Sequence, residues 1–303
     1  MPDNQIAIRC FSPDDIPEIL ALLAKSFPDY WAPLIRNGLD HLQYGNTPFV
    51  ATGGSRIVGT FGMKKLPVSL NGIQSLTAGI CSVAVDPEYR GLGIATKLSS
   101  FALDYCRNEN IGTSILFTDK PAVYEKSGWR ICPWRKPLRI MKKNRTDRIG
   151  TGIIHGIPSD FELELLQNIY RNGSPDFNGK IIRSREYWEN IVFNNLQKNA
   201  VCLLTEKAYA LLYCKNDSCN LIEMFSLSDD IAVFGKLFDN VLDFAKGDIN
   251  VSLPEKHPLM SLVNSYDSGI TYDLYGEEFM INVLNPSLAG VSDDFYIAYA
   301  DKF

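Results

Sequence analysis

Short apolar runs alternate with amphipathic stretches along the first half of the chain. Strand-like runs lie at residues 5–10, 48–52, 57–65, 73–85, 114–118 and 129–141. Helical spacing of apolar residues occurs at residues 12–23, 33–42, 93–108 and around Tyr124. Asn71-Gly72 separates two of the strand-like runs, and that dipeptide is typical of a tight β-hairpin. This order of elements predicts an α/β fold with a mixed central sheet flanked by helices.

The second half of the chain repeats this order. Helical patterns lie at residues 161–170, 184–193, 231–245 and 258–266, and strand-like runs at 201–205, 209–215, 220–226, 249–253 and 272–284. The strand ends at Val85 and Phe225 lie 140 residues apart, and the glycines after two matched helices, Gly128 and Gly269, lie 141 apart. A constant offset favours a duplicated domain. The polar stretch at 142–150 has the composition of a linker, so we expect domains over residues 1–142 and 150–303.

Composition narrows the class of protein. The chain has 303 residues, 46% hydrophobic and 21% charged, which suffices for two buried cores. The net charge of −5 and the lack of long Lys/Arg runs argue against nucleic acid as a partner. The N-terminus shows no charged-then-apolar leader and no apolar stretch approaches the length of a membrane span, so we expect a cytoplasmic protein without a membrane partner.

Cysteine and histidine usage gives no sign of a metal site. The seven cysteines are scattered without a Cys-x-x-Cys pair, and the chain has three histidines. We therefore expect reduced, buried thiols rather than disulfides, and no bound metal.

The most informative stretch is residues 83–95. Val83 and Val85 belong to a short apolar strand that stops at Asp86-Pro87, and a helix with apolar residues at helical spacing begins after Gly93. The backbone N–H groups from Gly91 to Thr96 would then lie unpaired at a helix N-terminus. Such groups, with the positive end of the helix dipole behind them, bind a diphosphate, and glycine lets the backbone approach it closely.

Two motifs carry a family resemblance. Residues 90–95, Arg-Gly-Leu-Gly-Ile-Ala, match the Arg/Gln-x-x-Gly-x-Gly/Ala signature of the GNAT acetyltransferases, and residues 122–129 resemble that family's Tyr-Glu-Lys-x-Gly-Phe segment. A Gly-x-Gly-x-x-Gly run is absent, which excludes the dinucleotide-binding alternative. The resemblance implies acetyl-CoA as acyl donor. It assigns the diphosphate to Arg90, Gly91, Leu92, Gly93, Ile94, Ala95 and Thr96, and the pantetheine arm to backbone groups of Val83 and Val85.

The second half lacks the glycine turn that would bind a diphosphate. The segment that matches the glycine turn is Leu227-Ser228-Asp229-Asp230-Ile231-Ala232, whose two carboxylates would repel a diphosphate. Residues 179–188 and the short 119–128 stretch resemble Eis-like acetyltransferases, which carry a second, inactive GNAT domain. The chain is therefore expected to hold two GNAT-like domains in tandem, the second degenerate, with one cofactor site. Eis-like proteins normally add a sterol-carrier-like domain, and this sequence ends at Phe303, too early to include one.

Candidate catalytic residues follow from the same resemblance. Tyr124 falls where the family places the general acid that protonates the coenzyme A thiolate, and a phenol is protonated at neutral pH. A packing role on an apolar helix face is the alternative. Residues 77–85 contain no Glu or Asp before Asp86, so the base is not evident. The candidates are Asp29, Asp119 and Glu125.

A further candidate for the base is the C-terminal carboxylate of Phe303. Related tandem-GNAT enzymes, the N-myristoyltransferases and Eis-like proteins, use their own C-terminus, and this tail is rich in aromatic residues. A surface-packed or disordered terminus is the alternative.

The predicted function is acetyl-CoA-dependent transfer of an acetyl group to a primary amine on a small molecule or peptide. A non-catalytic acyl-CoA binding or regulatory protein is an open alternative. So is a transferase of longer acyl chains with a deep pocket near Leu66, Val68 and Leu70. The sequence identifies neither the acceptor, although Eis-like enzymes suggest polyamine-like or aminoglycoside-like amines, nor the oligomeric state.

Overall fold

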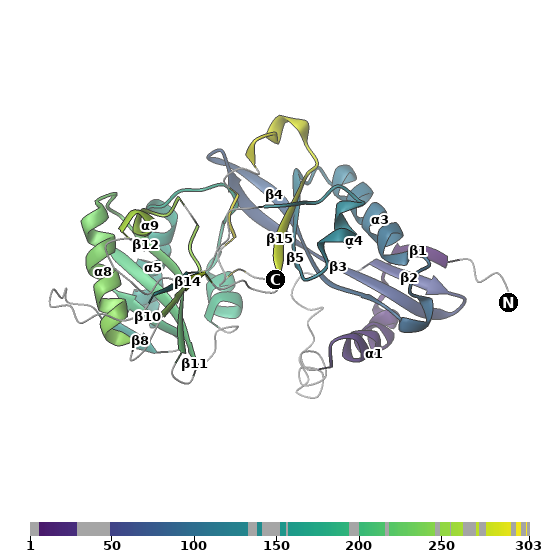
Figure 1. Ribbon diagram of the computed structural model, residues 1–303, viewed down its shortest axis with the longest axis horizontal. Helices are drawn as coiled ribbons and strands as arrows, with labels where there is room; N and C mark the ends of the chain where they lie inside the picture. Colours follow the sequence, from purple (N-terminus) through teal and green to yellow (C-terminus); the bar gives the residue numbers. More distant parts are fainter. Residues whose placement is uncertain are drawn as a thin grey trace.

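Two mixed β-sheets, each covered by helices, make up the molecule (Figure 1). The computed structural model describes residues 6–28, 49–132, 138–140, 152–155, 157–193, 200–215, 218–245, 249–254, 256–262, 271–272, 277–291, 295–297 and 301. The helix expected at 33–42 lies outside these residues. No helix in the described ranges is long and apolar enough to cross a membrane.

The first sheet is built mostly from the N-terminal half. Its strands, in spatial order, are β1 (Ile6–Cys10), β2 (Phe49–Gly53), β3 (Arg56–Leu70), β4 (Ile73–Val85), β5 (Thr113–Thr118), β15 (Glu278–Val283) and β6 (Arg130–Ile131). The short strand β9 (Lys180–Ile181) pairs with the far end of β3. Strands β4 and β5 run parallel, and α3 (Ile94–Asn108) connects them. The Asn71-Gly72 turn joins β3 to β4 as a hairpin, as the sequence predicts.

The second sheet repeats this plan. Its order is β14 (Thr271–Tyr272), β7 (Leu138–Ile140), β13 (Ile249–Val251), β12 (Ser218–Ser226), β11 (Ala208–Lys215), β10 (Ala200–Leu204) and β8 (Gly152–His155). Here β12 and β13 are the parallel pair, and α8 (Ile231–Phe244) connects them, as α3 connects β4 and β5. This recurrence of a parallel pair joined by a helix confirms the predicted α/β fold with two mixed sheets.

The other helices of the described residues connect or flank these strands. They are Pro13–Asp15, α1 (Ile16–Ser26), Pro87–Tyr89, α4 (Pro121–Glu125), α5 (Asp160–Asn172), α6 (Arg185–Tyr187), the π-helical Trp188–Phe193, α9 (Pro258–Leu262) and Pro286–Leu288. Ser159 begins α5 with a capping box, in which its side chain accepts from the N–H of Glu162. The helix expected at residues 184–193 is divided into two parts. These are α6 and the π-helical turn that follows it directly.

Sheet membership crosses the expected division at residues 142–150. Strand β15, from the end of the chain, lies between β5 and β6 of the first sheet, with Ile281 opposite Ile115. Strand β7, which precedes the division, pairs with β13 of the second sheet. Each sheet is completed by a strand from the other half of the chain. The domain limits of 1–142 and 150–303 stay a prediction. Strand pairing does not follow these limits, because β15 and β7 each join the sheet of the other half.

The first sheet has a buried core on each face. On one face, α3 and α4 cover residues such as Phe61, Met63 and Ile80. The opposite face has two smaller clusters: α1 packs over Val50, Ile57 and Ala84, while Phe295 and Ile297 from the end of the chain pack over Leu66, Val68 and Ile115.

One expectation about the cysteines is wrong. Cys214 and Cys219 form a disulfide across the β11–β12 hairpin, where they are directly opposite in the strand register. The other five cysteines are free, and Cys106, Cys132 and Cys202 among them are buried. The sequence pattern missed the pair because the two residues are five positions apart and only the hairpin brings them face to face.

Candidate functional site

The glycine turn lies between β4 and α3 and needs its glycines for conformational reasons. Gly91 and Gly93 have φ values of 82° and 71°, in the left-handed region that side-chain-bearing residues rarely adopt. Gly93 is the residue that begins α3. The turn therefore has a backbone path that other residues would strain, and it brings the chain straight into the helix.

Asp86 holds the start of this turn in place. Its carboxylate accepts hydrogen bonds from the N–H of Glu88 at 3.1 Å and from Lys25 at 3.2 Å, and its own N–H donates to Val58 O at 2.9 Å. Arg56 lies 3.7 Å away. The N–H bond from Glu88 and the two cations keep the pKa of the buried Asp86 carboxyl below its ordinary value. The loop is thereby fixed to β3 and to α1.

The N-terminus of α3 presents free backbone donors. Its first helical bond runs from Lys97 N–H to Gly93 O at 3.0 Å, so the amides of Ile94, Ala95 and Thr96 precede the helical ladder. A Cβ built on Gly91 or Gly93 meets nothing within 4 Å. The turn is thus open on its outer side, and a diphosphate fits there because donors, helix dipole and space coincide.

Some side chains of the turn are buried in the core and others are exposed to solvent. Ile94 is buried in the core under α3, whereas Leu92 is 58% exposed. Arg90 donates from Nε to Val85 O at 3.3 Å, and its side chain is exposed. Arg90 therefore adds a cation at the mouth of the turn, while Ile94 fixes the helix against the sheet.

Strands β4 and β5 separate beside this turn. Their parallel pairing runs from Thr77–Thr113 to Ile80–Leu116 and stops there, although β4 continues to Val85. Val83 and Val85 lie beyond the last pair and are half-buried. Their backbone edge toward β5 is thus available to an extended ligand, in the place that the sequence predicted for a pantetheine arm.

A β-bulge in β4 coincides with the point of separation. Cys81 pairs with Gly62 and Ala84 pairs with Thr60, so Ser82 and Val83 face a single residue of β3. Ser82 has a φ of 52°. A Cβ on Gly62 would lie 2.8 Å from Cys81 O, so Gly62 permits the close approach of the two backbones. The bulge turns β4 away from β5.

Tyr124 lies in α4, on the same sheet face as α3. Its ring packs edge-on against Trp129 at a centroid distance of 6.0 Å, within the core that also contains Ile94 and Leu98. Burial, aided by Asp119, raises the pKa of Tyr124 to about 12, so the phenol keeps its proton at neutral pH. Its hydroxyl has no hydrogen-bond partner among the described residues. A buried phenol with an unused proton can serve as an acid.

Lys64 and Cys81 occupy the opposite face, between the cluster under α1 and the cluster under the C-terminal segment. Lys64 makes no ion pair with any described residue, and burial lowers its pKa. Burial raises the pKa of the Cys81 thiol, which Lys64 offsets in part. Reasoning from the sequence missed both residues. The one available signal was a lysine pair inside the otherwise apolar stretch at 57–70.

The other candidates from the sequence are either exposed or outside the described residues. Asp119 and Glu125 are exposed. Asp29 and the C-terminal Phe303 lie outside the described residues, although Asp301, two positions before the end, is buried. No group of three or more His, Cys, Asp or Glu side chains that could hold a metal ion occurs in the described ranges.

The matching segment of the second sheet is closed to anions. Asp230 begins α8, and its carboxylate accepts from Ala232 N–H at 2.9 Å. Asp229 binds the hydroxyl of Ser174. One backbone donor of this helix N-terminus is therefore already bound by a negative side chain, which agrees with a single diphosphate site in the first half.

The N-terminal part of the chain matches a known family model. A family model described as an acetyltransferase (GNAT) domain matches residues 7–132, the stretch that holds β1 to β6 and the glycine turn. No curated protein matches the chain significantly.

Several solved structures share the fold along nearly the whole chain. A conserved Enterococcus faecalis protein, titled a probable N-acyltransferase, superposes with a TM-score of 0.75 at 14% identity, covering 94% of this chain and 74% of its own. A GCN5-related N-acetyltransferase from Kribbella flavida gives 0.71 at 16% identity, with 94% and 72% covered. Eis1 from Mycobacterium abscessus gives 0.67 at 15% identity, with 92% and 73% covered. These likenesses establish the tandem fold.

Proposed function

We propose, from the match of residues 7–132 to a GNAT acetyltransferase domain model, that the protein transfers an acetyl group from acetyl-CoA to a primary amine of a small molecule or peptide. The observation that carries the proposal is the open glycine turn at the N-terminus of α3, directly beside the point where β4 leaves β5. The two features give one ligand a diphosphate site and an adjoining strand edge.

The residues of the turn bind and orient the donor. Acetyl-CoA supplies an activated thioester when bound. The amides from Gly91 to Thr96 and the Arg90 side chain hold its diphosphate, since both offer positive charge and donors. Backbone groups of Val83 and Val85 pair with the extended arm. A backbone N–H at this edge stabilises the negative charge that develops on the carbonyl oxygen during attack.

Tyr124 supplies the proton for the departing thiolate. Its pKa of about 12 keeps it protonated throughout the neutral range, and its hydroxyl is not committed to any described residue. The phenol donates its proton to the sulfur as the carbon–sulfur bond breaks, and because a phenolate is a stronger base than a thiolate, Tyr124 then regains a proton from solvent.

Deprotonation of the amine needs a base that β4 does not contain. We assign that role to the C-terminal carboxylate of Phe303, and the burial of Asp301, two positions earlier, supports this assignment. A carboxylate there also attracts the cationic form of the acceptor and lowers the cost of removing its proton.

Two measurements test the proposed function. Thiol release from acetyl-CoA is followed with a panel of primary amines, and binding of acetyl-CoA is measured separately by calorimetry. Turnover that needs the amine supports an N-acetyltransferase. Binding of acetyl-CoA without turnover for any amine contradicts it and favours a non-catalytic acyl-CoA binding protein. Faster turnover with longer acyl-CoA donors than with acetyl-CoA contradicts the acetyl assignment alone.

A further inference from the structure

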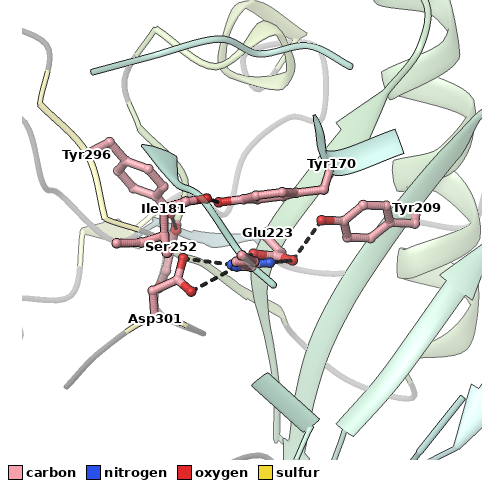
Figure 2. A network of polar contacts seen from close by, with 8 residues as sticks. Tyr170, Ile181, Tyr209, Glu223, Ser252, Tyr296 and Asp301 are labelled. Carbon is pink, nitrogen blue, oxygen red and sulfur yellow. Dashed lines mark hydrogen bonds and ion pairs between the residues drawn. The ribbon is translucent and has the colours of Figure 1, made fainter. Parts of the chain in front are cut away.

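Three of the lysine and arginine side chains in the described ranges are buried or half-buried, and two of them have polar partners within the protein. The side chain of Arg183 is 0% exposed, and it donates two hydrogen bonds each to Asp301 and Glu223 at 2.7–3.0 Å (Figure 2). Lys180 donates to Gly173 O at 3.3 Å. Such partners are expected, because burying a cation without them costs free energy.

The third of these side chains, Lys64, has no negative partner. It is half-buried on β3 and makes no hydrogen bond or ion pair with any described residue. Burial lowers its pKa, and the group that opposes this effect is the Cys81 thiol rather than a carboxylate. The next residue, Lys65, is on the other face of the strand, where it is exposed and paired with Glu109 at 2.7 Å. Lys64 is thus an ammonium group that an anion from outside the chain can neutralise.

Lys64 lies beside the point where β4 and β5 separate. In the strand register it is opposite Gly79 of β4, and Gly79 pairs with Ile115 of β5, one position before the last pair of these two strands. Neighbouring strands are about 4.8 Å apart, and Gly79 has no side chain to fill the space between them. Lys64 is therefore one strand away from the edge along which an extended acyl donor would lie.

The two faces of the sheet differ at this place. On the face covered by α3 and α4, Met63 and Ile80 are part of the buried core, so that face is closed to an acceptor. On the other face the residues beside Lys64 are Gly62, two positions earlier on β3, and Gly79, opposite on β4. Glycines leave the sheet without side chains there. An acceptor that approaches the strand edge from this face passes the Lys64 ammonium.

We propose that Lys64 binds a carboxylate of the acceptor, and that the acceptor is therefore an amine that also carries an acidic group, as an amino acid does. This inference rests on the proposed function for the identity of the anion as part of the acceptor. A hydrogen bond between two charged groups, one of them fixed on the sheet, orients the amino group toward the thioester. A polyamine-like or aminoglycoside-like acceptor would instead bring further positive charge to Lys64, and like charges repel.

Matched acceptors test this preference for an acidic group. Alanine, glutamate and phenylalanine are each compared with the corresponding α-amide, which has nearly the same shape without the negative charge, and spermidine represents the polyamines. We expect kcat/KM of the wild type to be at least about tenfold higher for each amino acid than for its amide, the lower end for a hydrogen bond to a charged group. Equal values for acid and amide, or a preference for spermidine, overturn the proposal.

Substitutions of Lys64 test whether this residue causes the preference. Lys64→Met removes the charge, Lys64→Arg keeps it, and Lys65→Met is the matched control because it removes the neighbouring ammonium on the other face. In Lys64→Met we expect KM for the amino acids to rise by about 10- to 10²-fold. We expect kcat, and KM for the amides, to stay near wild type. Lys64→Arg and Lys65→Met should resemble the wild type. An equal loss with acids and amides overturns a role in binding the carboxylate.

Calorimetry separates this proposal from the proposed function. The probes are the N-acetylated forms of the same amino acids, whose binding requires no turnover. We expect Lys64→Met to bind them at least about tenfold more weakly than the wild type. If the wild type acetylates no amine but binds the probes through Lys64, the proposed function fails and the anion site stands. Equal affinities of the two proteins, or no binding to either, overturn the site. Should Lys64→Met fail to fold, Lys64→Gln makes the same comparison.

Discussion

Ile80 of β4 and Leu116 of β5 form the last register pair between these two parallel strands. β4 continues as far as Val85, and the bulge at Ser82 and Val83 begins one residue later, after Cys81. The glycine turn follows at the end of the same strand. One continuous stretch of chain therefore determines both where the sheet opens and where a helix N-terminus faces outward.

Gly93→Glu should abolish most binding of acetyl-CoA. The substitution puts a negative charge and a side chain beside the diphosphate, and repulsion between close charges near a protein surface is worth a few kcal/mol, or about 10²-fold in affinity. Gly72→Glu is the matched control, because Gly72 has a similar φ of 74° and equally open surroundings, but lies at the tip of the β3–β4 hairpin. Calorimetry should give one site per chain. Two equivalent sites, or equal affinities of the two variants, contradict the prediction.

Tyr124→Phe should lower kcat with little change in the affinity for acetyl-CoA. The ring keeps its contact with Trp129, and only the proton donor is lost, which is worth about 10²- to 10⁴-fold. Tyr105→Phe provides the comparison, since Tyr105 packs against the same core on α3. A wild-type kcat in Tyr124→Phe, measured where chemistry limits the rate, removes this residue from the mechanism.

Extending the C-terminus should depress acetyl transfer. A short tag after Phe303 moves the terminal carboxylate, whereas the same tag at the N-terminus leaves it in place. We expect the C-terminal tag to reduce kcat by about 10²-fold, the lower end of the range for a positioned base, with acetyl-CoA affinity maintained. Equal rates for both tagged proteins would leave the base to a water chain, to Asp119 or to Glu125.

Acetyl-CoA should protect Cys81 from alkylation. Cys81 is partly exposed and lies at the bulge where β4 leaves β5, whereas Cys10 is exposed on β1. Because burial raises the pKa of Cys81, its labelling by a maleimide at pH 8 should be slower than that of Cys10. Mass spectrometry should show that acetyl-CoA slows labelling of Cys81 and leaves Cys10 unaffected. Equal protection of both thiols would place the ligand elsewhere.

The stability of the second sheet should depend on pH through His257. This buried ring accepts a hydrogen bond at Nδ1 from Leu259 N–H at 3.0 Å and donates from Nε2 to Met224 O at 3.0 Å, so it is neutral. Burial lowers its pKa from 6.5 to about 4. The unfolded chain therefore binds a proton at a higher pH than the folded one. This contribution is complete above pH 6.5 and is lost as the pH falls toward 4, by about 3 kcal/mol in total.

His257→Gln should flatten that dependence. Denaturant unfolding between pH 7 and pH 4 measures it, and His155→Gln is the control because His155 is exposed on the edge strand β8. The wild type and the control should lose stability in parallel as the pH falls, and His257→Gln should lose less. An identical slope in all three proteins would show that His257 is protonated at the same pH whether or not the chain is folded.

Local features of this protein were readable in the sequence because the residues that fix them are neighbours. Gly91 and Gly93 adopt left-handed conformations and begin a helix whose apolar residues recur at helical spacing. Asn71-Gly72 closes the hairpin between β3 and β4. Backbone sterics and the first turn of a helix decide these elements within a few residues, so the turn, its helix and the position of Tyr124 were all predictable.

Tertiary structure alone decided which distant segments meet. The strands β15 and β7 resemble their neighbours in apolar pattern, so nothing local tells which sheet each one joins. Their exchange between sheets depends on pairing across the whole chain. The same holds for Arg183, whose partners Glu223 and Asp301 are scattered along the sequence and are brought together only when the two sheets and the C-terminal segment pack. A buried charge is stable only where partners surround it, and that surrounding exists only in the folded molecule.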